Sequence, residues 1–312
     1  MTTAVPVARA RVTSAEQRPP RRRKRGTVAP YLFIAPFLIF FAAMLLVPIF
    51  YALYLSLFQN QLIGGQVFVG FANYVKAFTD SEFWAGVVRV LLYLVIQVPI
   101  MLGLAVFFAL AIDSGYVRGS KFVRLAIFVP YAIPGVVSTL MWGYFYGNNF
   151  GLIAQIFRAV HLAPPDLLSS HTILGSMMNI STWQFVGYNM IIIYAALRSV
   201  PSELFESAAI DGAGQWRIAW SIKLPAVRGA VLICVIFSII GSFQLFTEPS
   251  LLQPLAPTVI TNSFTPTFYA YNLAFINLQP NYAAAVAFIL GFSIMIVSYV
   301  VQLTAQRRNR LA

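Results

Sequence analysis

Charged residues are scarce in this chain. Of its 312 residues only 10% are Asp, Glu, Lys or Arg, while 59% are hydrophobic. An ordinary soluble domain is roughly 25% charged and about 45–50% apolar. So little charge cannot cover a water-exposed surface, and the mean hydropathy of +0.77 agrees. The composition therefore predicts a protein whose outer face contacts membrane lipid.

Several chemical motifs are also missing. The single cysteine, Cys234, cannot form a disulfide within the chain, which excludes a disulfide-stabilised scaffold. The sequence contains no G-x-x-x-x-G-K-[ST] and no H-E-x-x-H, the patterns of a phosphate-binding loop and of a zinc protease helix. His161 and His171 stand alone in one polar loop, which favours a solvated loop over a metal site. We therefore expect no catalytic residues, no metal, no cofactor and no enzyme activity.

Acidic residues are fewer than basic ones. The 9 Asp and Glu oppose 21 Lys and Arg, for a net charge of +12. In a soluble protein such a balance suggests a nucleic-acid partner. Here the basic residues are too few and too scattered to line a groove, so we expect no nucleic acid. They are better interpreted as signals of membrane orientation.

Long apolar runs fill most of the chain. A transmembrane helix needs about 20 mostly apolar residues, and six segments meet or nearly meet this length. They predict an all-α membrane protein with six transmembrane helices over residues 31–58, 90–112, 122–146, 172–197, 227–247 and 282–305. Residues 1–30, rich in Arg and Pro, are expected to be a disordered basic tail, and residues 306–312 a second basic tail. The first apolar run exceeds the roughly 7–15 residues of a cleavable signal sequence, so it is expected to remain as a helix.

The basic residues fall mostly on one side of these helices. With a cytoplasmic N-terminus, all of the 21 Lys and Arg lie in cytoplasmic segments except Lys76, Arg89 and Arg158. Cytoplasmic loops of membrane proteins carry the excess of Lys and Arg. The sequence therefore predicts a multi-pass protein of a bacterial-type plasma membrane with both termini in the cytoplasm. Its longest cytoplasmic loop is residues 198–228.

That loop carries the signals of a short surface helix. Pro201 suits the first helical position and Glu203 complements the helix dipole in the first turn. Gly212 suits the left-handed residue that ends a helix. The pattern predicts a helix of about ten residues followed by a turn. Small side chains such as Ala208 would let another protein approach closely, although a solvated amphipathic connector remains an alternative.

The same loop resembles a known motif. Glu206-Ser207-Ala208 is followed by three residues, Gly212, nine residues and Ile222-Lys223-Leu224-Pro225. This spacing is similar to the EAA loop of permeases in binding-protein-dependent ABC importers, with Ser207 in place of the first Ala. The segments 29–36 and 47–57 further resemble the first-permease family of the maltose, glycerol-phosphate and lactose type. The resemblance covers nearly the whole chain and implies the type I ABC importer permease fold.

The resemblance also implies partners and a mechanism. In this family the loop forms a coupling helix that docks into a separate ATPase subunit. Glu206 would make the charged contact, Ala208 would permit close approach, Asp211 would support the loop, and Gly212 would allow the turn. The implied partners are a second permease in a heterodimer, two ATP-binding subunits and an extracytoplasmic solute-binding protein that delivers a carbohydrate.

Polar side chains inside the apolar segments suggest where a solute passes. Such residues are costly in a membrane and mark pathways by default. Together with interleaved aromatic residues they form candidate pathway faces in the fourth and fifth spans: Ser181, Trp183, Gln184, Phe185, Tyr188 and Asn189, and then Ser238, Ser242, Phe243 and Gln244. Hydroxyls, amides and aromatic rings suit a sugar. The alternative, that these polar groups join helices to one another, remains open for each residue.

One rival class of transporter shares this composition. An ion-coupled secondary transporter of small solutes normally needs ionisable relays within its spans. No acid lies in the middle of a predicted span, and Asp113 and Glu248 are expected at span ends. This favours the ABC importer. The absence of basic residues on the pathway faces argues against a phosphorylated cargo, and the sequence leaves the particular sugar or polyol open.

Overall fold

The computed structural model describes residues 29–61 and 63–311. The predicted disordered tail therefore lies outside the described residues, except for Ala29 and Pro30, which begin the first helix. The chain divides into two compact units, residues 1–50 and 51–312. Each is described by itself below.

The first unit is helical over all of its described residues. Helix α1 (Ala29–Phe41) continues through a π-helical turn (Ala42–Leu46) into α2 (Val47–Ser56), which extends past the unit boundary. The segment Tyr31–Ser56 is 26 residues long and strongly apolar. At 1.5 Å per residue it reaches about 39 Å, more than the roughly 30 Å of a hydrocarbon core. It corresponds to the first predicted span.

The second unit opens with a small hairpin that the sequence did not predict. Strands β1 (Phe58–Gln61) and β2 (Gly65–Phe68) pair antiparallel, and α3 (Ala72–Thr79) follows. The buried amide of Asn73 donates to the backbone oxygens of Ser56 (2.8 Å) and Phe58 (2.9 Å). These bonds fix the hairpin on α3.

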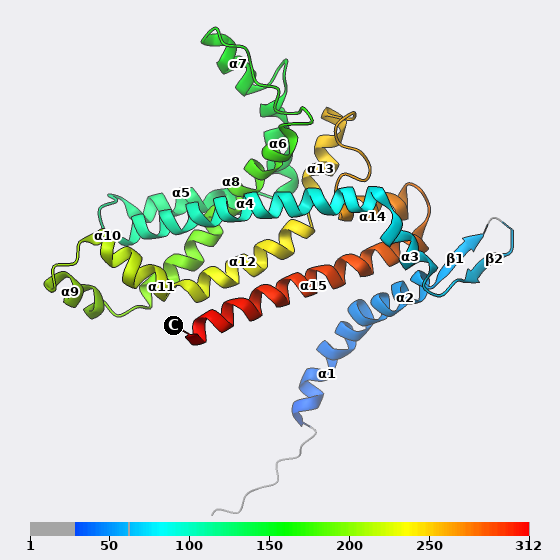
Figure 1. The fold of residues 1–312 in the computed structure, drawn as a ribbon, viewed down its shortest axis with the longest axis horizontal. Coiled ribbons are helices and arrows are strands. Elements are labelled where there is room, and N and C mark those ends of the chain that lie inside the picture. The colour runs from blue at the N-terminus through cyan, green and yellow to red at the C-terminus, as the bar shows by residue number, and fades with distance from the viewer. Residues whose placement is uncertain (1–28, 62, 312) are drawn as a thin grey trace, which may run out of the picture. The chain divides into compact units, whose positions relative to one another are not determined.

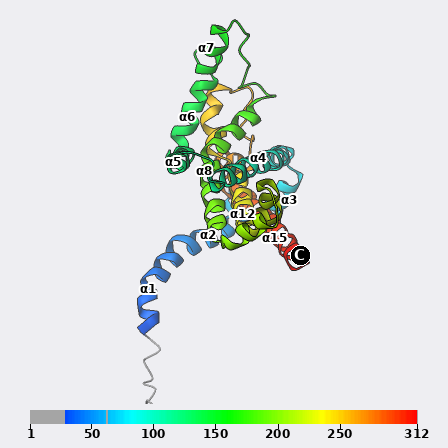
Figure 2. The ribbon, with the colours of Figure 1, turned by 90° about the vertical axis from the view of Figure 1, so that its left-hand side faces the viewer.

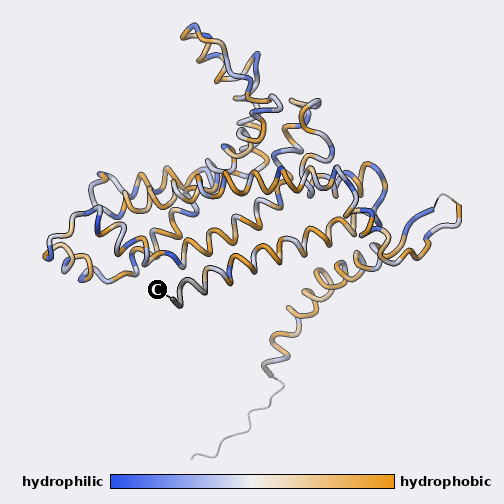
Figure 3. Tube along the Cα trace, in the orientation of Figure 1, coloured by the Kyte–Doolittle hydropathy of each residue, from blue (hydrophilic) through white to orange (hydrophobic). Residues whose placement is uncertain are grey.

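Four long helices build the body of the second unit. They are α4 (Ser81–Asp113), α8 (Ile173–Arg198), α12 (Arg228–Phe243) and α15 (Pro280–Leu311). Helix α4 packs on α8 and α12, and α12 packs on α15 (Figures 1 and 2). Hydrophobic residues run along α4, α12 and α15, whereas hydrophilic residues gather near the hairpin and α9–α10 (Figure 3).

The third predicted span is not one straight helix. Residues 122–146 belong to α5 (Ser120–Ala132) and α6 (Gly135–Tyr146), which are bent by 96°. Pro134 precedes α6 and cannot donate the backbone hydrogen bond that would continue α5. Beyond α6 comes the short helix α7 (Leu152–Ala159). The hydropathy pattern predicts the length of this apolar segment but does not reveal the bend within it.

The loop before the fifth span is also helical and bent. Helix α9 (Glu203–Ile210) leads to α10 (Gln215–Ile218), a π-helical turn (Ala219–Lys223) and α11 (Leu224–Ala226). The segment Gln215–Ala226 meets α12 at 62°. Within the described residues four unbroken helices are long and apolar enough to cross a membrane, or six if each bent pair counts as one span.

Two short helices close the other end of the unit. They are α13 (Thr247–Leu252), which a 3₁₀ turn (Gln253–Leu255) extends, and α14 (Pro266–Phe275). Helix α13 packs on α6, and α14 packs on α4 and α15. The α9–α11 segment and α14 therefore lie at opposite ends of α4 (Figure 1).

Candidate functional site

A cavity of about 460 Å³ opens in the second unit. Its walls come from α4, the bend between α5 and α6, α8, α12 and the residues that follow α12. All but two of the predicted pathway residues line it: Ser181, Gln184, Phe185, Tyr188, Asn189, Ser238, Ser242 and Gln244. The two polar faces predicted on separate spans thus meet around one space. Their role in transport remains a prediction.

The two remaining pathway residues point elsewhere. Trp183 packs edge-to-face on Trp142, with ring centroids 5.8 Å apart. Phe243 is buried in a cluster with Val90 and Ile239. Each is adjacent in sequence to a cavity residue, and neighbouring residues on a helix point about 100° apart. Neither side chain is in the lining of the cavity.

The amide of Gln184 is already engaged by the bend of the third span. Its Nε2 atom donates to the backbone oxygen of Ile133 at 3.1 Å, and its Oε1 atom accepts from Ser138 Oγ at 3.1 Å. Ile133 lies directly after α5, where the broken helix leaves a carbonyl without a helical partner. Gln184 therefore joins α8 to the α5–α6 bend, as the helix-packing alternative describes, while also facing the cavity.

An aromatic group forms another part of the wall. Tyr131, from the end of α5, stacks on Tyr188 with ring centroids 4.6 Å apart and lies edge-on to Phe185 at 6.0 Å. Stacked rings present flat apolar faces of the kind that contact sugar rings. Sequence reasoning missed Tyr131 because it lies in an apolar segment without a polar face. The available signal was its position between Pro130 and Pro134, which indicate a break in the helix.

Helix α4 contributes lining residues that sequence reasoning also missed. Tyr93, Gln97 and Met101 follow each other at intervals of four and share one face. Gln97 Nε2 donates to Met101 Sδ at 3.3 Å and to Thr182 Oγ1 at 3.4 Å. The available signal was the amide of Gln97 in an otherwise apolar, uncharged span. With these residues α4 becomes the third long helix that lines the cavity.

Glu248 is the acid of this site. The sequence placed it at the end of the fifth span, and the structure places it in the cavity wall on α13. Ser181 Oγ donates to Glu248 Oε1 at 3.0 Å. Burial raises the pKa of the carboxyl above its ordinary value, and the Ser181 hydrogen bond opposes this shift. Because the two residues are 67 positions apart, no local pattern could have paired them.

The predicted surface helix is present as α9, and its end shows why Gly212 is needed. Gly212 has a φ of +80°, the left-handed conformation that glycine adopts without steric cost. The amide of Ala213 donates to Ala208 O (2.9 Å) and that of Gly212 to Ala209 O (3.1 Å). This is the Schellman arrangement of a helix C-terminus. Ala208 and Ala213 line one small hollow beneath the turn.

The face of α9 is open to a partner. Glu206 and Asp211 are exposed, and so are the apolar side chains of Leu204 and Ile210, the latter 87% exposed. In the part of the chain whose side chains are described, Lys223 and Asp113 form the one ion pair, so Glu206 has no cationic partner there. Large apolar side chains exposed outside the membrane-spanning segments are a common feature of interaction surfaces. The contact of α9 with a partner remains a prediction.

Metal chemistry finds no support in the described residues. Within them, no group of three or more His, Cys, Asp or Glu side chains could hold a metal ion. The cavity instead offers hydrogen-bonding amides, hydroxyls, one carboxylate and aromatic faces. Such a lining can bind a polyhydroxylated solute through hydrogen bonds and ring contacts.

Comparisons with known proteins agree with this arrangement. The family described as "Binding-protein-dependent transport system inner membrane component" matches residues 25–310. The arabinooligosaccharides transport system permease protein AraP of Bacillus subtilis is 30% identical over 279 residues, covering 87% of each chain. The lactose transport system permease protein LacF of Rhizobium radiobacter is 28% identical over 286 residues, covering 89% of this chain and 94% of its own.

A solved structure shares the fold. It is the crystal structure of a bacterial alginate ABC transporter in complex with an alginate pentasaccharide-bound periplasmic protein. A chain of that structure superimposes with a TM-score of 0.76 at 22% identity, covering 90% of this chain and 94% of the other. The likeness extends over nearly all of both chains.

Proposed function

Because the chain belongs to the family of inner membrane components of binding-protein-dependent transport systems, we propose that it is the permease subunit of an ATP-driven importer and that its cavity forms part of a passage for a carbohydrate. Members of this family are multi-pass plasma-membrane proteins and not enzymes; ATP hydrolysis resides on a separate subunit. The observation that carries the proposal is the meeting of the predicted polar faces of α8 and α12 around one cavity.

The chemistry of the wall supports a sugar as cargo. Amides and hydroxyls that donate and accept hydrogen bonds face the same space as the stacked rings of Tyr131 and Tyr188. Two relatives are named for arabinooligosaccharide and lactose transport. The structural neighbour imports alginate, but at 22% identity that likeness bears on the fold alone.

Helix α9 is the proposed contact with the ATPase. Glu206 supplies an exposed charge without a cationic partner among the described side chains, and Asp211 a second polar group. Ala208 and Gly212 keep the end of the helix compact. The proposed assembly contains two ATP-binding subunits, a second permease that makes a heterodimer with this chain, and an extracytoplasmic binding protein. The exposed acidic and apolar face of α9 supports such docking.

A reconstituted transporter tests the function. The chain is co-expressed with its partner permease and ATPase, placed in liposomes, and assayed for sugar uptake with loaded binding protein. We expect uptake that requires ATP and that falls in Gln244→Ala, whose exposed amide lines the cavity. Gln184→Ala is the poorer test because it also frees the bend at Ile133. Uptake driven by a proton gradient without ATP would instead support the ion-coupled alternative, which the family membership does not favour.

The orientation, with both termini and α9 in the cytoplasm, has its own test. Cys234 is buried, and a Cys234→Ala background leaves no native thiol. In it, Ser170→Cys and Ser202→Cys each introduce one thiol at an exposed serine. An impermeant maleimide should label Ser170→Cys in intact spheroplasts and Ser202→Cys only after permeabilisation. The reverse pattern would show the opposite orientation.

A further inference from the structure

The carboxylate of Glu248 uses only part of its hydrogen-bonding capacity. Its Oε1 atom accepts from Ser181 at 3.0 Å. Its Oε2 atom accepts no hydrogen bond from another described residue, and it keeps some accessible area although the carboxyl as a whole is deeply buried. Glu248 lines the cavity, so one acceptor oxygen is left for a solute.

Glu248 also sets the charge of this wall. Among the residues that line the cavity it is the one acid, and none of the lining residues is Lys, Arg or His. The nearest basic residue along α4, Arg89, is held elsewhere: its Nη1 atom donates to Phe264 O at 3.3 Å, and its guanidinium lies 5.1 Å from the Phe264 ring centroid. An anionic solute would therefore meet a carboxylate and no compensating cation among the described residues that line the cavity.

We propose that Glu248 determines which charge of sugar the passage accepts, binding hydroxyl or amino groups of neutral or amino-bearing sugars and rejecting sugars that carry a carboxylate or a phosphate. The lone pairs of Oε2 accept hydrogen bonds from hydroxyl or ammonium groups, and more strongly when the carboxyl is ionised. An anion is disfavoured because burial makes negative charge in this wall costly, as the raised pKa of Glu248 reflects, and no cation in the lining offsets it. The ionised form of Glu248 adds direct like-charge repulsion. The inference rests on the proposed carbohydrate function and names the class of sugar within it.

The test uses three monosaccharides that share the same ring framework and differ in charge. The assembled transporter in nanodiscs, without its binding protein, is titrated with glucose, glucosamine and glucuronate, and dissociation constants are measured by saturation-transfer NMR. In the wild type we expect glucuronate to bind at least about tenfold more weakly than glucose. Glu248→Gln should bring the two constants close together, and Glu248→Asp should keep them apart.

Two further variants complete the design. Glu203→Gln makes the same charge change at an exposed position of α9, away from the cavity, and should leave the ratio of constants unchanged. Gln244→Lys adds a cation to the cavity wall and should strengthen glucuronate binding, which keeps the test decisive if Glu248→Gln fails to assemble. An unchanged ratio in Glu248→Gln, or no gain for glucuronate in Gln244→Lys, overturns the role of Glu248.

The proposed function and this inference fail differently. If the wild type binds all three sugars equally, the charge selectivity is wrong while a carbohydrate passage stands. If the wild type binds none of the three, both the carbohydrate passage and the selectivity of Glu248 are overturned.

Discussion

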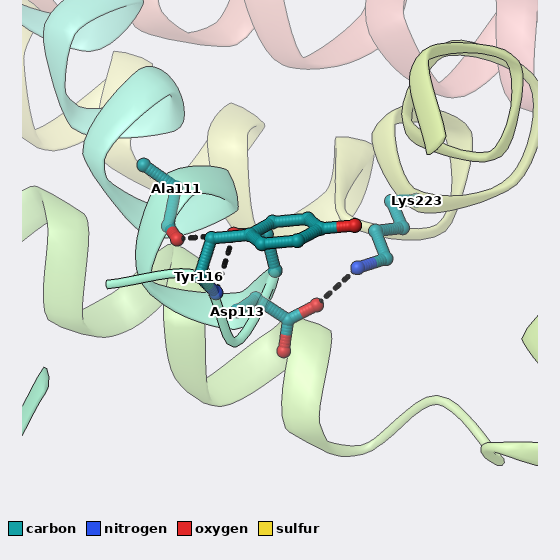
Figure 4. A network of polar contacts seen from close by, with 5 residues as sticks. Ala111, Asp113, Tyr116 and Lys223 are labelled. Atoms are coloured by element: carbon teal, nitrogen blue, oxygen red, sulfur yellow. Dashed lines mark hydrogen bonds and ion pairs between the residues drawn. The ribbon is translucent and has the colours of Figure 1, made fainter. Parts of the chain in front are cut away.

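The Nζ atom of Lys223 lies 2.5 Å from Oδ2 of Asp113, and the two side chains are 10% and 7% exposed (Figure 4). Asp113 is the last residue of α4, and Lys223 ends the π-helical turn after α10. The ammonium of Lys223 also lies 5.0 Å from the ring centroid of Phe205 on α9. One buried cation thus connects the proposed ATPase contact to a helix that lines the cavity.

Breaking this pair should uncouple the transporter. Asp113→Asn leaves a buried ammonium without a counter-ion, which typically costs about 3–5 kcal/mol of stability. We expect a lower unfolding temperature and a loss of the ATPase stimulation that loaded binding protein produces. The double charge swap Asp113→Lys with Lys223→Asp should recover part of both. Normal thermal stability and normal stimulated ATPase activity in Asp113→Asn would show that the ion pair contributes neither to folding nor to coupling.

The end of α9 allows a test with a matched control. Gly212 has a φ of +80° and open space around its Cα, whereas Gly214 has a φ of −66° and equally open space. Gly212→Ala should therefore cost about 1–2 kcal/mol through backbone strain alone, and Gly214→Ala should cost little. Substrate-stimulated ATPase activity, measured beside binding-protein affinity, should fall only in Gly212→Ala. Equal activity of the two variants would contradict the role of the turn.

The charge of Glu206 is tested separately. Glu206→Lys reverses an exposed charge without disturbing a hydrogen bond or ion pair described in the chain. Transport and stimulated ATPase activity should be lost, while binding-protein affinity and folding remain. Glu206→Gln, which keeps the shape of the side chain, should retain more activity than Glu206→Lys. Normal stimulated ATPase activity in Glu206→Lys would place the ATPase contact elsewhere.

The sequence predicts those structural features whose signals lie in neighbouring residues. The apolar spans and the α9–Gly212 turn follow from neighbouring residues, so hydropathy and glycine placement predict them. The polar faces of α8 and α12 follow from helical periodicity, which correctly joins Gln184 to Tyr188. Trp183 is about 100° from Gln184 on the helix. Its aromatic chemistry suggests a pathway residue, but its angle places it away from the cavity.

The remaining features depend on distant residues. The 96° bend between α5 and α6 leaves the Ile133 carbonyl for Gln184, 51 positions away. Glu248 enters the cavity because α13 turns back to Ser181. Such pairs carry no signature in either local segment. A hydropathy scan therefore treats residues 122–146 as one straight span and places Glu248 at the end of the fifth span, outside any site.

Close contact between α5 and α8 depends on Gly187. A Cβ atom built there would lie 2.0 Å from Ile127 O, so the two backbones touch. Gly187→Ala should force the helices apart, disturb the Gln184 bridge and cost about 1–3 kcal/mol. Gly175→Ala, on the same helix with no atom within 4 Å of the new Cβ, should be neutral or slightly stabilising. Thermal unfolding of both variants in nanodiscs measures the difference, and equal unfolding temperatures would refute the contact.

Asp80 joins three helices at the other end of α4. Its Oδ1 atom accepts from the backbone amides of Glu82 (3.0 Å) and Phe83 (3.3 Å), which caps α4. Its Oδ2 atom accepts from the hydroxyls of Tyr269 (2.7 Å) and Tyr282 (2.6 Å). Burial alone would raise the pKa of Asp80, but these hydrogen bonds outweigh it and hold the pKa below its ordinary value.

The lowered pKa of Asp80 gives stability a defined pH dependence. Since the folded protein holds the carboxyl ionised more firmly than the unfolded chain, the stabilisation is complete above the ordinary carboxyl pKa, about 4, and is lost as the pH falls through the lowered value. Asp80→Asn should lower the free energy of unfolding by about 1.5–3 kcal/mol at neutral pH and so unfold at a lower temperature than the wild type. The gap should stay constant between pH 7 and about 5, then narrow below about pH 4. Tyr282→Phe should show a smaller loss, and Tyr299→Phe, at an exposed position of the same helix, none. A gap that is the same at pH 3 and pH 7 would show that the Asp80 charge contributes nothing.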